Sequence, residues 1–437
     1  MATKLSRRGF LSGAAVLVAA PAVVRGATAA VDADVVVVGG GVAGLAAAGR
    51  LGAAGRRVVV LEARGRIGGR AFTDEAALGV PFDRGAHWLH NADVNPFRAD
   101  AARLGRRTWP SPADDMLVLR DGRPLADGAA SLWSAMAALE RRAWLRGIVG
   151  SDFALGTAAR GEMQQAAADL AALTMATDAD RLSARDYATL AEGEDYVVEG
   201  GLGRLVADLG GAVPVRTGHI VRRIDWTGAG EVAVAGDFGT VRARRVVVTV
   251  PPPVLAGGAI RFDPPLPADR QAALAALEGG RFVKVGFRLD APLSEVPEYV
   301  FDIGRALRGE AAGLYLDRRL PLATVIFAGS HAEAVSRGGA AALEAAGRQA
   351  LTDALGAAVA ARVSRATSTD WSADPFSGGS YTVLRLGAAG AREAYGRPVD
   401  DRLFFAGDSA AGPYAVTVMG ARQSGEAAAT AILSLPV

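Results

Sequence analysis

The chain has 437 residues, of which 50% are hydrophobic and 22% are charged, so it is long and apolar enough to fold around a sizeable core. It contains no cysteine and only four histidines. This excludes disulfides, thiolate nucleophiles and cysteine-ligated metals, and it argues against a multi-histidine centre, so we predict no metal site. The 48 basic and 46 acidic side chains nearly balance, and no basic stripe carries interleaved aromatic residues, so nucleic-acid binding is disfavoured.

The N-terminus has the pattern of an export signal. Arg7 and Arg8 precede a weakly apolar stretch of about 14 residues, 11–24, and a small-residue cleavage pattern follows at 27–29. The stretch is shorter than the roughly 20 residues that span a bilayer, which disfavours the alternative of a membrane anchor. We therefore expect residues 1–29 to engage the twin-arginine translocation machinery, leaving a periplasmic or secreted protein without a stable membrane span.

The mature part opens with the pattern of a β-α-β unit. An apolar run at 34–38 predicts a strand buried on both faces, and a helix over 42–54 and a strand over 57–61 follow. The turn between the first strand and the helix has the form GxGxxG, Gly39-Gly40-Gly41-Val42-Ala43-Gly44. Its glycines would permit a tight turn, close approach of a pyrophosphate and close helix packing, while Glu62 could accept from ribose hydroxyls. The unit therefore predicts a binding site for a dinucleotide cofactor, either NAD or FAD.

The patterns in the rest of the chain predict a mixture of helices and strands, and we find no internal repeat and no Pro/Ser-rich linker. Further helices are predicted over roughly 96–105, 129–147, 161–175, 339–358 and 418–433. Further strands are predicted over 219–224, 231–235, 241–250, 281–289, 312–318, 323–328 and 403–406. The opening β-α-β unit predicts an α/β fold, and because no linker separates the later elements we expect the domains to be discontinuous.

Two segments carry a resemblance to a known family. Leu61-Glu62-Ala63-Arg64-Gly65-Arg66-Ile67-Gly68-Gly69-Arg70 resembles the segment after the second strand in flavin-dependent amine oxidases, and Phe404-Phe405-Ala406-Gly407-Asp408 resembles that family's closing flavin motif. In the family the following helix points its positive N-terminus at the flavin pyrimidine. The resemblance covers roughly 33–433 and implies FAD rather than NAD.

The resemblance also implies the architecture. It predicts an FAD-binding Rossmann-like domain of the glutathione-reductase-like type, interleaved with a substrate domain of mixed sheet and helices. The FAD-binding domain would comprise 31–80, 199–253 and 378–437. The substrate-binding domain would comprise 81–198 and 254–377.

The segment Gly85-Ala86-His87-Trp88-Leu89-His90, followed by Asn95-Pro96, looks most similar to the polyamine oxidase and histone-demethylase branch. The family chain passes beside the flavin ring here, and the resemblance places His90 on the substrate channel. Asn91 stands where that branch has glycine. Core packing is the alternative role for Trp88.

Lys284 lies in an alternating strand, where it would either face solvent or, as the resemblance implies, hold a water at flavin N5 and supply positive charge for oxygen reduction. The stretch from Trp371 to Tyr381 resembles the family pattern W-x-x-DP-x-x-x-G-S-Y. Ser380 stands where monoamine oxidases carry the flavin-linking cysteine, so non-covalent FAD is expected, and Tyr381 would form one wall of an aromatic cage. Thr417 stands where monoamine oxidases carry the tyrosine that forms the second wall of this aromatic cage.

These matches assign the site residues. The catalytic assignments are Lys284, Tyr381, His90 and Trp88. The cofactor assignments are Gly39, Gly41, Val42, Ala43, Gly44, Glu62, Ala63, Arg64, Gly69, Arg70, Gly85, Ala86, His87, Trp88, Val221, Trp371, Gly407, Asp408, Thr417 and Val418.

The expected function is oxidation of a small-molecule amine, a polyamine or related alkyl amine, to an imine and aldehyde, with O2 reduced to H2O2. An L-amino-acid oxidase is one alternative, with Arg84 as a candidate for the substrate carboxylate. A carotenoid-type desaturase or dehydrogenase and a catalytically inert flavin-binding protein are the others. Glu194, Asp195 and Glu199 could line an entrance, but a solvated loop is the favoured interpretation.

Overall fold

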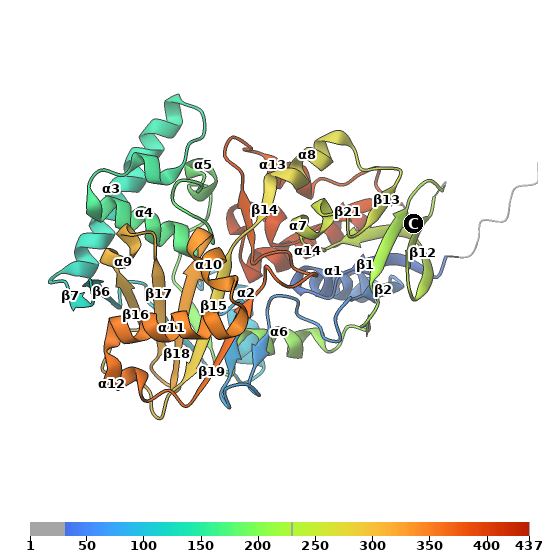
Figure 1. The fold of residues 1–437 in the computed structure, drawn as a ribbon. Coiled ribbons are helices and arrows are strands. Elements are labelled where there is room, and N and C mark those ends of the chain that lie inside the picture. Colours follow the sequence, from blue (N-terminus) through green and yellow to red (C-terminus); the bar gives the residue numbers. More distant parts are fainter. Residues whose placement is uncertain (1–30, 229, 437) are drawn as a thin grey trace, which may run out of the picture. The chain divides into compact units, whose positions relative to one another are not determined.

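Two mixed β-sheets organise the chain in the computed structural model, which describes residues 31–228 and 230–436 (Figure 1). The predicted signal peptide, 1–29, lies outside the described residues. No helix within the described ranges is both long enough and apolar enough to cross a membrane.

The first sheet has eight strands in the order β13-β10-β11-β12-β1-β2-β9, with β21 pairing the end of β12. Strands β21, β12, β1, β2 and β9 run parallel to one another, and β13 pairs in parallel with β10 at the other edge. The strand bounds are β1 (Ala33–Val38), β2 (Val58–Leu61), β9 (Val215–Arg216), β10 (Val221–Asp225), β11 (Val232–Gly236), β12 (Gly239–Val248), β13 (Arg261–Asp263) and β21 (Leu403–Phe405).

Helices cover both faces of this sheet, which explains why β1 is apolar at every position after Asp34. Val35 and Val37 pack against α1 (Val42–Ala53) and α14 (Val418–Leu433). Val36 and Val38 pack on the other face, against residues of α7 (Pro252–Ala256), α8 (Ala268–Ala276) and α13 (Ala391–Gly396). A Cβ on Gly425 would overlap the Ala43 carbonyl oxygen, so glycine lets α14 lie close to α1.

The second sheet has seven strands in the order β19-β15-β18-β17-β16-β6-β7. Their bounds are β6 (Met116–Arg120), β7 (Arg123–Pro124), β15 (Phe282–Arg288), β16 (Tyr299–Asp302), β17 (Ala312–Asp317), β18 (Leu322–Ala328) and β19 (Arg365–Asp370). One face packs on α10 (Gly329–Ser336) and α11 (Gly339–Leu355). The other packs on α3 (Gly128–Val149), α4 (Glu162–Thr174) and α9 (Ile303–Leu307).

Shorter elements lie between those of the two sheets or, like α12, beside one of them. The helices are α2 (Pro96–Arg103), α5 (Ala184–Tyr187), α6 (Leu202–Gly210) and α12 (Ala357–Ala360). The strand pairs are β3 (Thr73–Asp74) with β4 (Phe82–Asp83), β5 (Thr108–Pro110) with β8 (Tyr196–Val198), and β14 (Leu277–Gly279) with β20 (Thr382–Leu384). The chain crosses between the sheets several times, and the domain boundaries stay a prediction.

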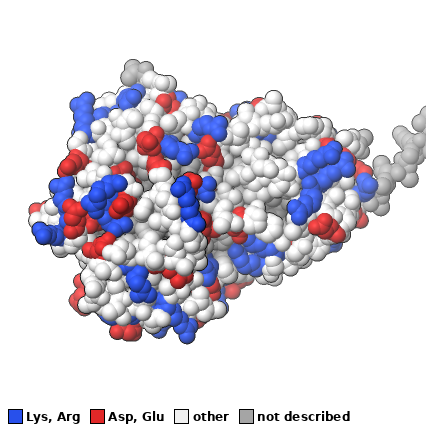
Figure 2. Space-filling view, in the orientation of Figure 1, with Lys and Arg blue, Asp and Glu red and all other residues white. Residues whose placement is uncertain are grey.

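The predicted α/β class is confirmed, and the predicted strands and helices all form, with ends shifted by a few residues. The helix predicted over 339–358 ends at Leu355, because Gly356 adopts φ +87° and breaks the helical path. The sequence does not predict strands β3 to β9, β13, β14, β16, β19 and β20, or helices α5 to α10, α12 and α13. Basic and acidic side chains are interspersed over the face seen in Figure 2, in keeping with their near balance in the sequence.

Candidate active site

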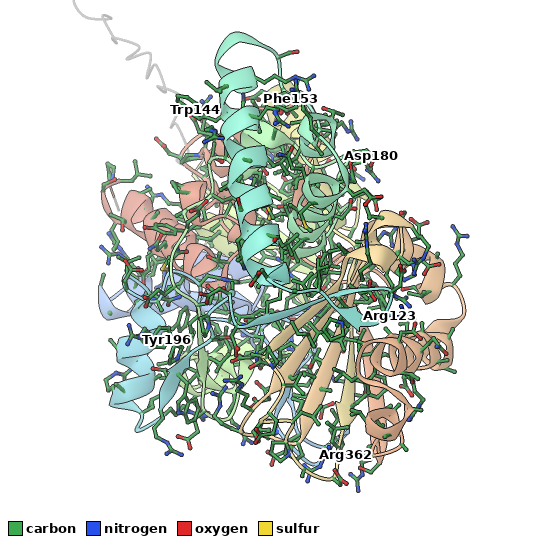
Figure 3. All side chains as sticks on the ribbon, turned by 90° about the vertical axis from the view of Figure 1, so that its left-hand side faces the viewer. Arg123, Trp144, Phe153, Asp180, Tyr196 and Arg362 are labelled. Atoms are coloured by element: carbon green, nitrogen blue, oxygen red, sulfur yellow. The ribbon has the colours of Figure 1, made fainter. Side chains whose placement is uncertain are left out.

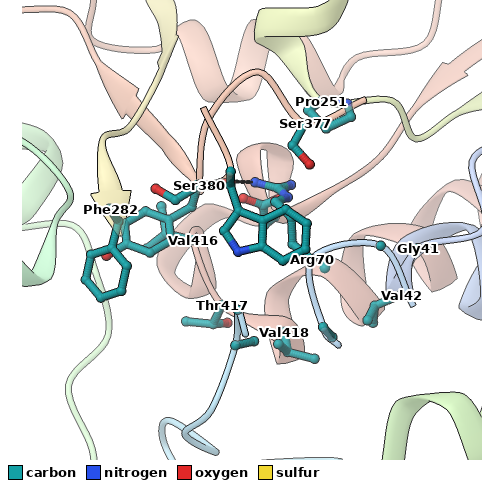
Figure 4. Close-up of a pocket in the computed structure, with 18 of the residues that line it drawn as sticks. Gly41, Val42, Arg70, Pro251, Phe282, Ser377, Ser380, Val416, Thr417 and Val418 are labelled. Atoms are coloured by element: carbon teal, nitrogen blue, oxygen red, sulfur yellow. Dashed lines mark hydrogen bonds and ion pairs between the residues drawn. The ribbon is translucent and has the colours of Figure 1, made fainter. Parts of the chain in front are cut away.

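A cavity of about 530 Å³ is lined by residues of both sheets and of the segments between them. Figure 4 shows part of its wall, with Gly41 and Val42 on one side and Phe282 on the other. Every residue that the sequence assigned to the cofactor or to catalysis lines this cavity except Gly44. Residues assigned from distant parts of the sequence therefore meet at one place.

The glycine-rich turn forms the cavity wall at the end of β1. Gly39 has φ +110°, which a residue with a side chain rarely adopts. A Cβ on Gly41 would meet no atom within 4 Å, so the backbone is bare on its cavity side. A Cβ on Gly44 would overlap the Gly39 carbonyl oxygen, so this glycine packs the helix against the turn. The bare turn at the start of α1 has the shape and helix polarity that suit a pyrophosphate.

Glu62 is held at the cavity edge by the turn itself. Its Oε2 accepts from the Gly40 backbone N–H at 2.6 Å and its Oε1 accepts from the Arg64 N–H at 2.8 Å. Each carboxylate oxygen keeps a further acceptor site, which fits a ribose hydroxyl. Arg64 itself donates to Asp374 at 2.7 Å and to Ser377 at 2.8 Å, so it ties this edge to the loop after β19.

The C-terminal motif supplies a further acceptor to the cavity wall. Arg70 donates to Asp408 Oδ1 at 2.6 Å and to the Ser380 carbonyl, the contact drawn in Figure 4. Asp408 Oδ2 is buried and has no hydrogen-bond partner. An unpaired buried carboxylate oxygen is costly, and a bound polyol hydroxyl would satisfy it. The residues present therefore fit the ribityl chain of a flavin nucleotide.

Thr417 caps the helix whose start faces the cavity. Its hydroxyl accepts from the Gly420 N–H at 2.9 Å and donates to the Tyr414 carbonyl at 2.8 Å. The N-terminus of α14, which carries partial positive charge, thus lies at the cavity wall with Val418. Met419 is 1% exposed and belongs to the core.

Lys284 is buried, which rules out the solvated-face alternative. Its Nζ donates to the carbonyl oxygens of Gly85 at 2.7 Å and Asp83 at 3.3 Å, and it lies 5.3 Å from the centroid of the Trp88 ring. Burial lowers the pKa of the Lys284 ammonium to about 8, while the Asp83 carboxylate acts in the opposite direction. With two of its three donors engaged, the ammonium keeps one for the cavity that it lines.

Asp83 holds the segment beneath Lys284, a role that the sequence did not reveal. Its carboxylate accepts from His87 Nδ1 at 2.9 Å and from the Thr73 hydroxyl at 2.5 Å. It also accepts from the backbone N–H groups of Leu202 and Gly203 at 3.1 Å each. Burial alone would raise the pKa of Asp83, but these hydrogen bonds and the neighbouring charges lower it. His87 Nε2 is buried without a partner.

Aromatic rings form the wall beside Lys284. The Trp88 ring stacks on Tyr299 at 6.4 Å between centroids and meets Tyr315 edge-on at 5.5 Å. The Tyr381 ring lies 5.8 Å from Phe282, and its hydroxyl donates to the Thr174 carbonyl. Sequence reasoning missed Tyr299 and Tyr315. The alternation in 312–318 could have placed Tyr315 on one face of its strand, but no local signal marked Tyr299.

His90 lines the cavity together with Asp195, and the two side chains are 2.8 Å apart. Asp195 lies in the loop before β8, as expected, but its side chain lines the cavity, because the bridge between Leu89 and Tyr196 brings it beside His90. Glu199 instead pairs with Arg107, away from the cavity. Asn91 adopts φ +53°, a left-handed conformation that asparagine tolerates in place of glycine.

Arg84 does not line the cavity. It pairs with Asp74 at 2.7 Å and donates to the hydroxyls of Thr367 and Thr369. The arginines that do line the cavity are Arg64, Arg70 and Arg222, which all come from the dinucleotide motif or from β10. The candidate contact of Arg84 with a substrate carboxylate is therefore not supported.

Comparisons with known proteins agree with this geometry. Residues 42–185 and 165–433 match the family profile described as flavin containing amine oxidoreductase. Lysine-specific histone demethylase 1 homolog 1 from Oryza sativa subsp. japonica is 30% identical over 90% of this chain and 51% of its own length. The chain thus spans about half the length of this relative. Polyamine oxidase 4 from the same organism is 26% identical over 91% of this chain and 88% of its own.

A putrescine oxidase from Kocuria rosea is 32% identical over 55% of this chain and 61% of its own length. Among solved structures, cyclohexylamine oxidase from Brevibacterium oxydans IH-35A superposes with a TM-score of 0.79 at 23% identity, over 92% of this chain and 98% of its own. That likeness shows the fold. Since the family profile matches most of the chain and the cavity fits the cofactor, the chain belongs to the flavin-containing amine oxidoreductases and its cofactor is non-covalently bound FAD.

Proposed function

We propose that this chain is an FAD-dependent amine oxidase that oxidises a C–N bond of a polyamine or related alkyl amine. The observation that carries the proposal is the buried Lys284 at the cavity wall, with its ammonium on the Gly85 carbonyl and the Trp88 ring beside it. This places a positive charge at the wall of an aromatic cavity that also carries the dinucleotide motif. Family membership and the relatives' names support the same reaction class.

The cavity wall favours the reactive form of the substrate. An amine must be neutral at nitrogen before its α-carbon can give up a hydride, and desolvation among Trp88, Tyr299 and Tyr381 lowers the pKa of a bound ammonium. Bound FAD supplies the redox chemistry, while Tyr381 and Trp88 would orient the substrate. The product imine then hydrolyses to an aldehyde and an amine.

The side chains that line the cavity support the proposed substrate class. Tyr299, Tyr315 and Phe282 provide apolar surface for an alkyl chain, and Asp195 with His90 provides a carboxylate and an imidazole. A carboxylate suits a second ammonium better than a substrate carboxylate. Because the cavity arginines all belong to the cofactor end or to β10, an L-amino-acid oxidase is less well supported. A carotenoid-type desaturase would need neither the buried Lys284 nor Asp195.

We further propose O2 as the electron acceptor, with Lys284 supplying positive charge as oxygen is reduced to H2O2. Export by the twin-arginine route is a separate proposal that rests on Arg7, Arg8 and 27–29 alone. Expression in strains with and without that translocase tests it. Flavin-loaded protein should leave the cytoplasm only where the translocase is present, and equal export in both strains would contradict it.

The test of the activity is steady-state oxygen consumption with a panel of putrescine, spermidine, spermine, acetylated polyamines, benzylamine and L-amino acids. We expect consumption with at least one polyamine or alkyl amine, matched by equimolar H2O2 and aldehyde. Consumption only with L-amino acids would replace the proposal by an amino-acid oxidase. An FAD-loaded protein that consumes no oxygen with any of them would favour the desaturase or inert alternative.

A further inference from the structure

Val416 has an unusual backbone conformation beside the cavity. Its φ is +62°, in the left-handed region, where the Cβ of a side chain crowds the carbonyl oxygen that follows it. Seven residues other than glycine have positive φ in the described chain; five are aspartate or asparagine, which tolerate this conformation, and one is Ala176. Among the described residues, Val416 is thus the single β-branched one held there, and glycine would not be crowded.

Hydrogen bonds on both sides of Val416 fix this conformation. Its N–H donates to the carbonyl oxygen of Asp408 at 3.0 Å. The next residue, Thr417, accepts from the Gly420 N–H at 2.9 Å and donates to the Tyr414 carbonyl at 2.8 Å. Strained backbone persists where the surrounding contacts determine it in this way, and it gathers at functional sites. The conformation of Val416 therefore directs attention to what its side chain does.

The Val416 side chain packs on the part of the molecule built on the second sheet, although α14, which follows it, packs on the first. Its partners form a hydrophobic cluster whose other members all lie between 88 and 328. Figure 3 faces this part of the molecule, with α3 toward the viewer. Trp88, Leu173 and Phe282 belong to the cluster and line the cavity, as Val416 does. Val416 thus meets the second-sheet cluster at the cavity wall.

Val416 lies where the residues assigned to the cofactor meet the aromatic wall. Thr417 and Val418, which follow it, line the cavity at the start of α14, and the Tyr381 and Phe282 rings are 5.8 Å apart on the wall. In the view of Figure 4, Val416 lies between Phe282 and Thr417. An isopropyl group here narrows the cavity at the junction of its cofactor end and its substrate end.

We propose that Val416 is a specificity-determining residue, whose isopropyl group selects amines that are unbranched at the carbon next to nitrogen. The inference rests on the proposed function, because it concerns the amine that the cavity would oxidise. A second substituent on that carbon needs space at the junction, and a side chain that branches at Cβ leaves less of it than alanine or glycine. Glycine at position 416 would relieve the backbone but widen the cavity.

The first test compares hexylamine with cyclohexylamine, which have the same number of carbons but differ in branching next to nitrogen. Stopped-flow mixing of the FAD-loaded protein without oxygen gives the rate constant of flavin reduction and the Kd of each amine. We expect wild type to prefer hexylamine, and Val416→Ala and Val416→Gly to shift the ratio of rate constant to Kd toward cyclohexylamine by about tenfold or more. Val254→Ala truncates another valine of the cavity wall, on α7, and should keep the wild-type ratio.

The second test measures the backbone strain without any substrate. Val416→Gly and Val416→Ala both remove the isopropyl group, so they differ only in the Cβ that a φ of +62° disfavours. We expect the FAD-loaded glycine variant to melt at a higher temperature than the alanine variant. At an ordinary helical position the order is reversed, so Ala345→Gly, at an exposed position of α11, should lower the melting temperature.

The outcomes separate this inference from the proposed function. A wild type that prefers cyclohexylamine, or an unchanged ratio in both Val416 variants, would overturn the inference while amine oxidation stands. An equal shift in Val254→Ala would also overturn it, because any loosening of the wall would then have the same effect. A Val416→Ala protein more stable than Val416→Gly would overturn the strained conformation on which it depends. Flavin that no amine reduces would overturn the proposed function and this inference together.

Discussion

The ammonium nitrogen of Lys284 lies 2.7 Å from the carbonyl oxygen of Gly85, although 198 residues separate the two in sequence. Gly85 packs directly against the segment that carries Arg70. A Cβ at position 85 would overlap the Arg70 carbonyl oxygen, so only glycine fits here. The contact joins the second sheet, which carries Lys284, to the segment that the family places beside the flavin. It is the structural basis for the first two predictions.

Replacing Lys284 by methionine should leave a folded, FAD-loaded protein that reoxidises slowly. Methionine fills a similar volume but removes the positive charge that would stabilise reduced oxygen. Stopped-flow mixing of dithionite-reduced protein with oxygen isolates this step from amine oxidation. We expect a fall of at least tenfold in the reoxidation rate constant, and a rate equal to that of wild type would contradict the role of Lys284.

The same rate constant should depend on pH through the lysine. Burial lowers the pKa of Lys284 to about 8, so the ammonium is present below this pH and is lost as the pH rises through it. Reoxidation of wild type should therefore slow across about pH 8, whereas the methionine variant should show no such transition. An identical pH profile in both proteins would assign the transition to another group.

The two glycines of the dinucleotide turn should respond differently to alanine. At Gly41 a Cβ meets no protein atom, so Gly41→Ala should fold normally but bind FAD at least tenfold more weakly, since the methyl group would occupy the pyrophosphate position. At Gly44 the Cβ overlaps the Gly39 carbonyl, so Gly44→Ala should lower the melting temperature of the apoprotein itself. Melting curves of both apoproteins and FAD titration separate the two effects. Equal FAD affinity of Gly41→Ala and wild type would mean that the turn does not hold the pyrophosphate.

A buried ion pair should matter more to stability than an exposed one on the same helix. Arg392 donates to both oxygens of Asp186 at 2.8 Å, and the two side chains are 9% and 7% exposed. Asp186→Asn would leave the guanidinium without its charge partner, at a cost of about 3–5 kcal/mol in unfolding free energy. Glu393→Ala removes only an exposed partner of Arg397 and should change stability little. Urea denaturation measures both, and similar losses in the two variants would contradict the account.

All of the flavin should leave the protein on denaturation. By the resemblance of 371–381 to the family pattern, Ser380 stands where monoamine oxidases carry the linking cysteine, and the chain has no cysteine at all. After acid or heat treatment and centrifugation, the yellow colour should be entirely in the supernatant. Flavin absorbance that stays with the pelleted protein would reveal a covalent link through another residue.

Local patterns were sufficient for the dinucleotide half of the molecule. The turn at Gly39 depends on residues adjacent in sequence, so its motif predicts both the turn and the helix after it. Local pattern also predicts the helix after Thr417, but its place beside the cofactor came from the resemblance. The burial of Lys284 came from the resemblance, since the alternation of its strand fits either face. Its actual environment depends on the antiparallel pairing of β15 with β18 and β19.

The substrate half depends on pairings between distant segments. Tyr299 reaches the cavity because β16 pairs in parallel with β6, which places it opposite Met116. Asp195 reaches His90 because the adjacent Tyr196 bridges to Leu89. Neither pairing can be recognised in the local sequence. For this reason Tyr299 was not among the predicted site residues, and Asp195 was expected in a solvated loop.

The central claim, that this cavity oxidises amines with FAD, is tested most directly by the visible spectrum of the purified protein without oxygen, before and after adding amines. The account predicts that the flavin band at about 450 nm bleaches with at least one polyamine or alkyl amine, and more slowly or not at all with L-amino acids. A flavin spectrum that no amine bleaches would contradict the proposed activity, and a protein that binds no flavin even after reconstitution would contradict the account of the site as a whole.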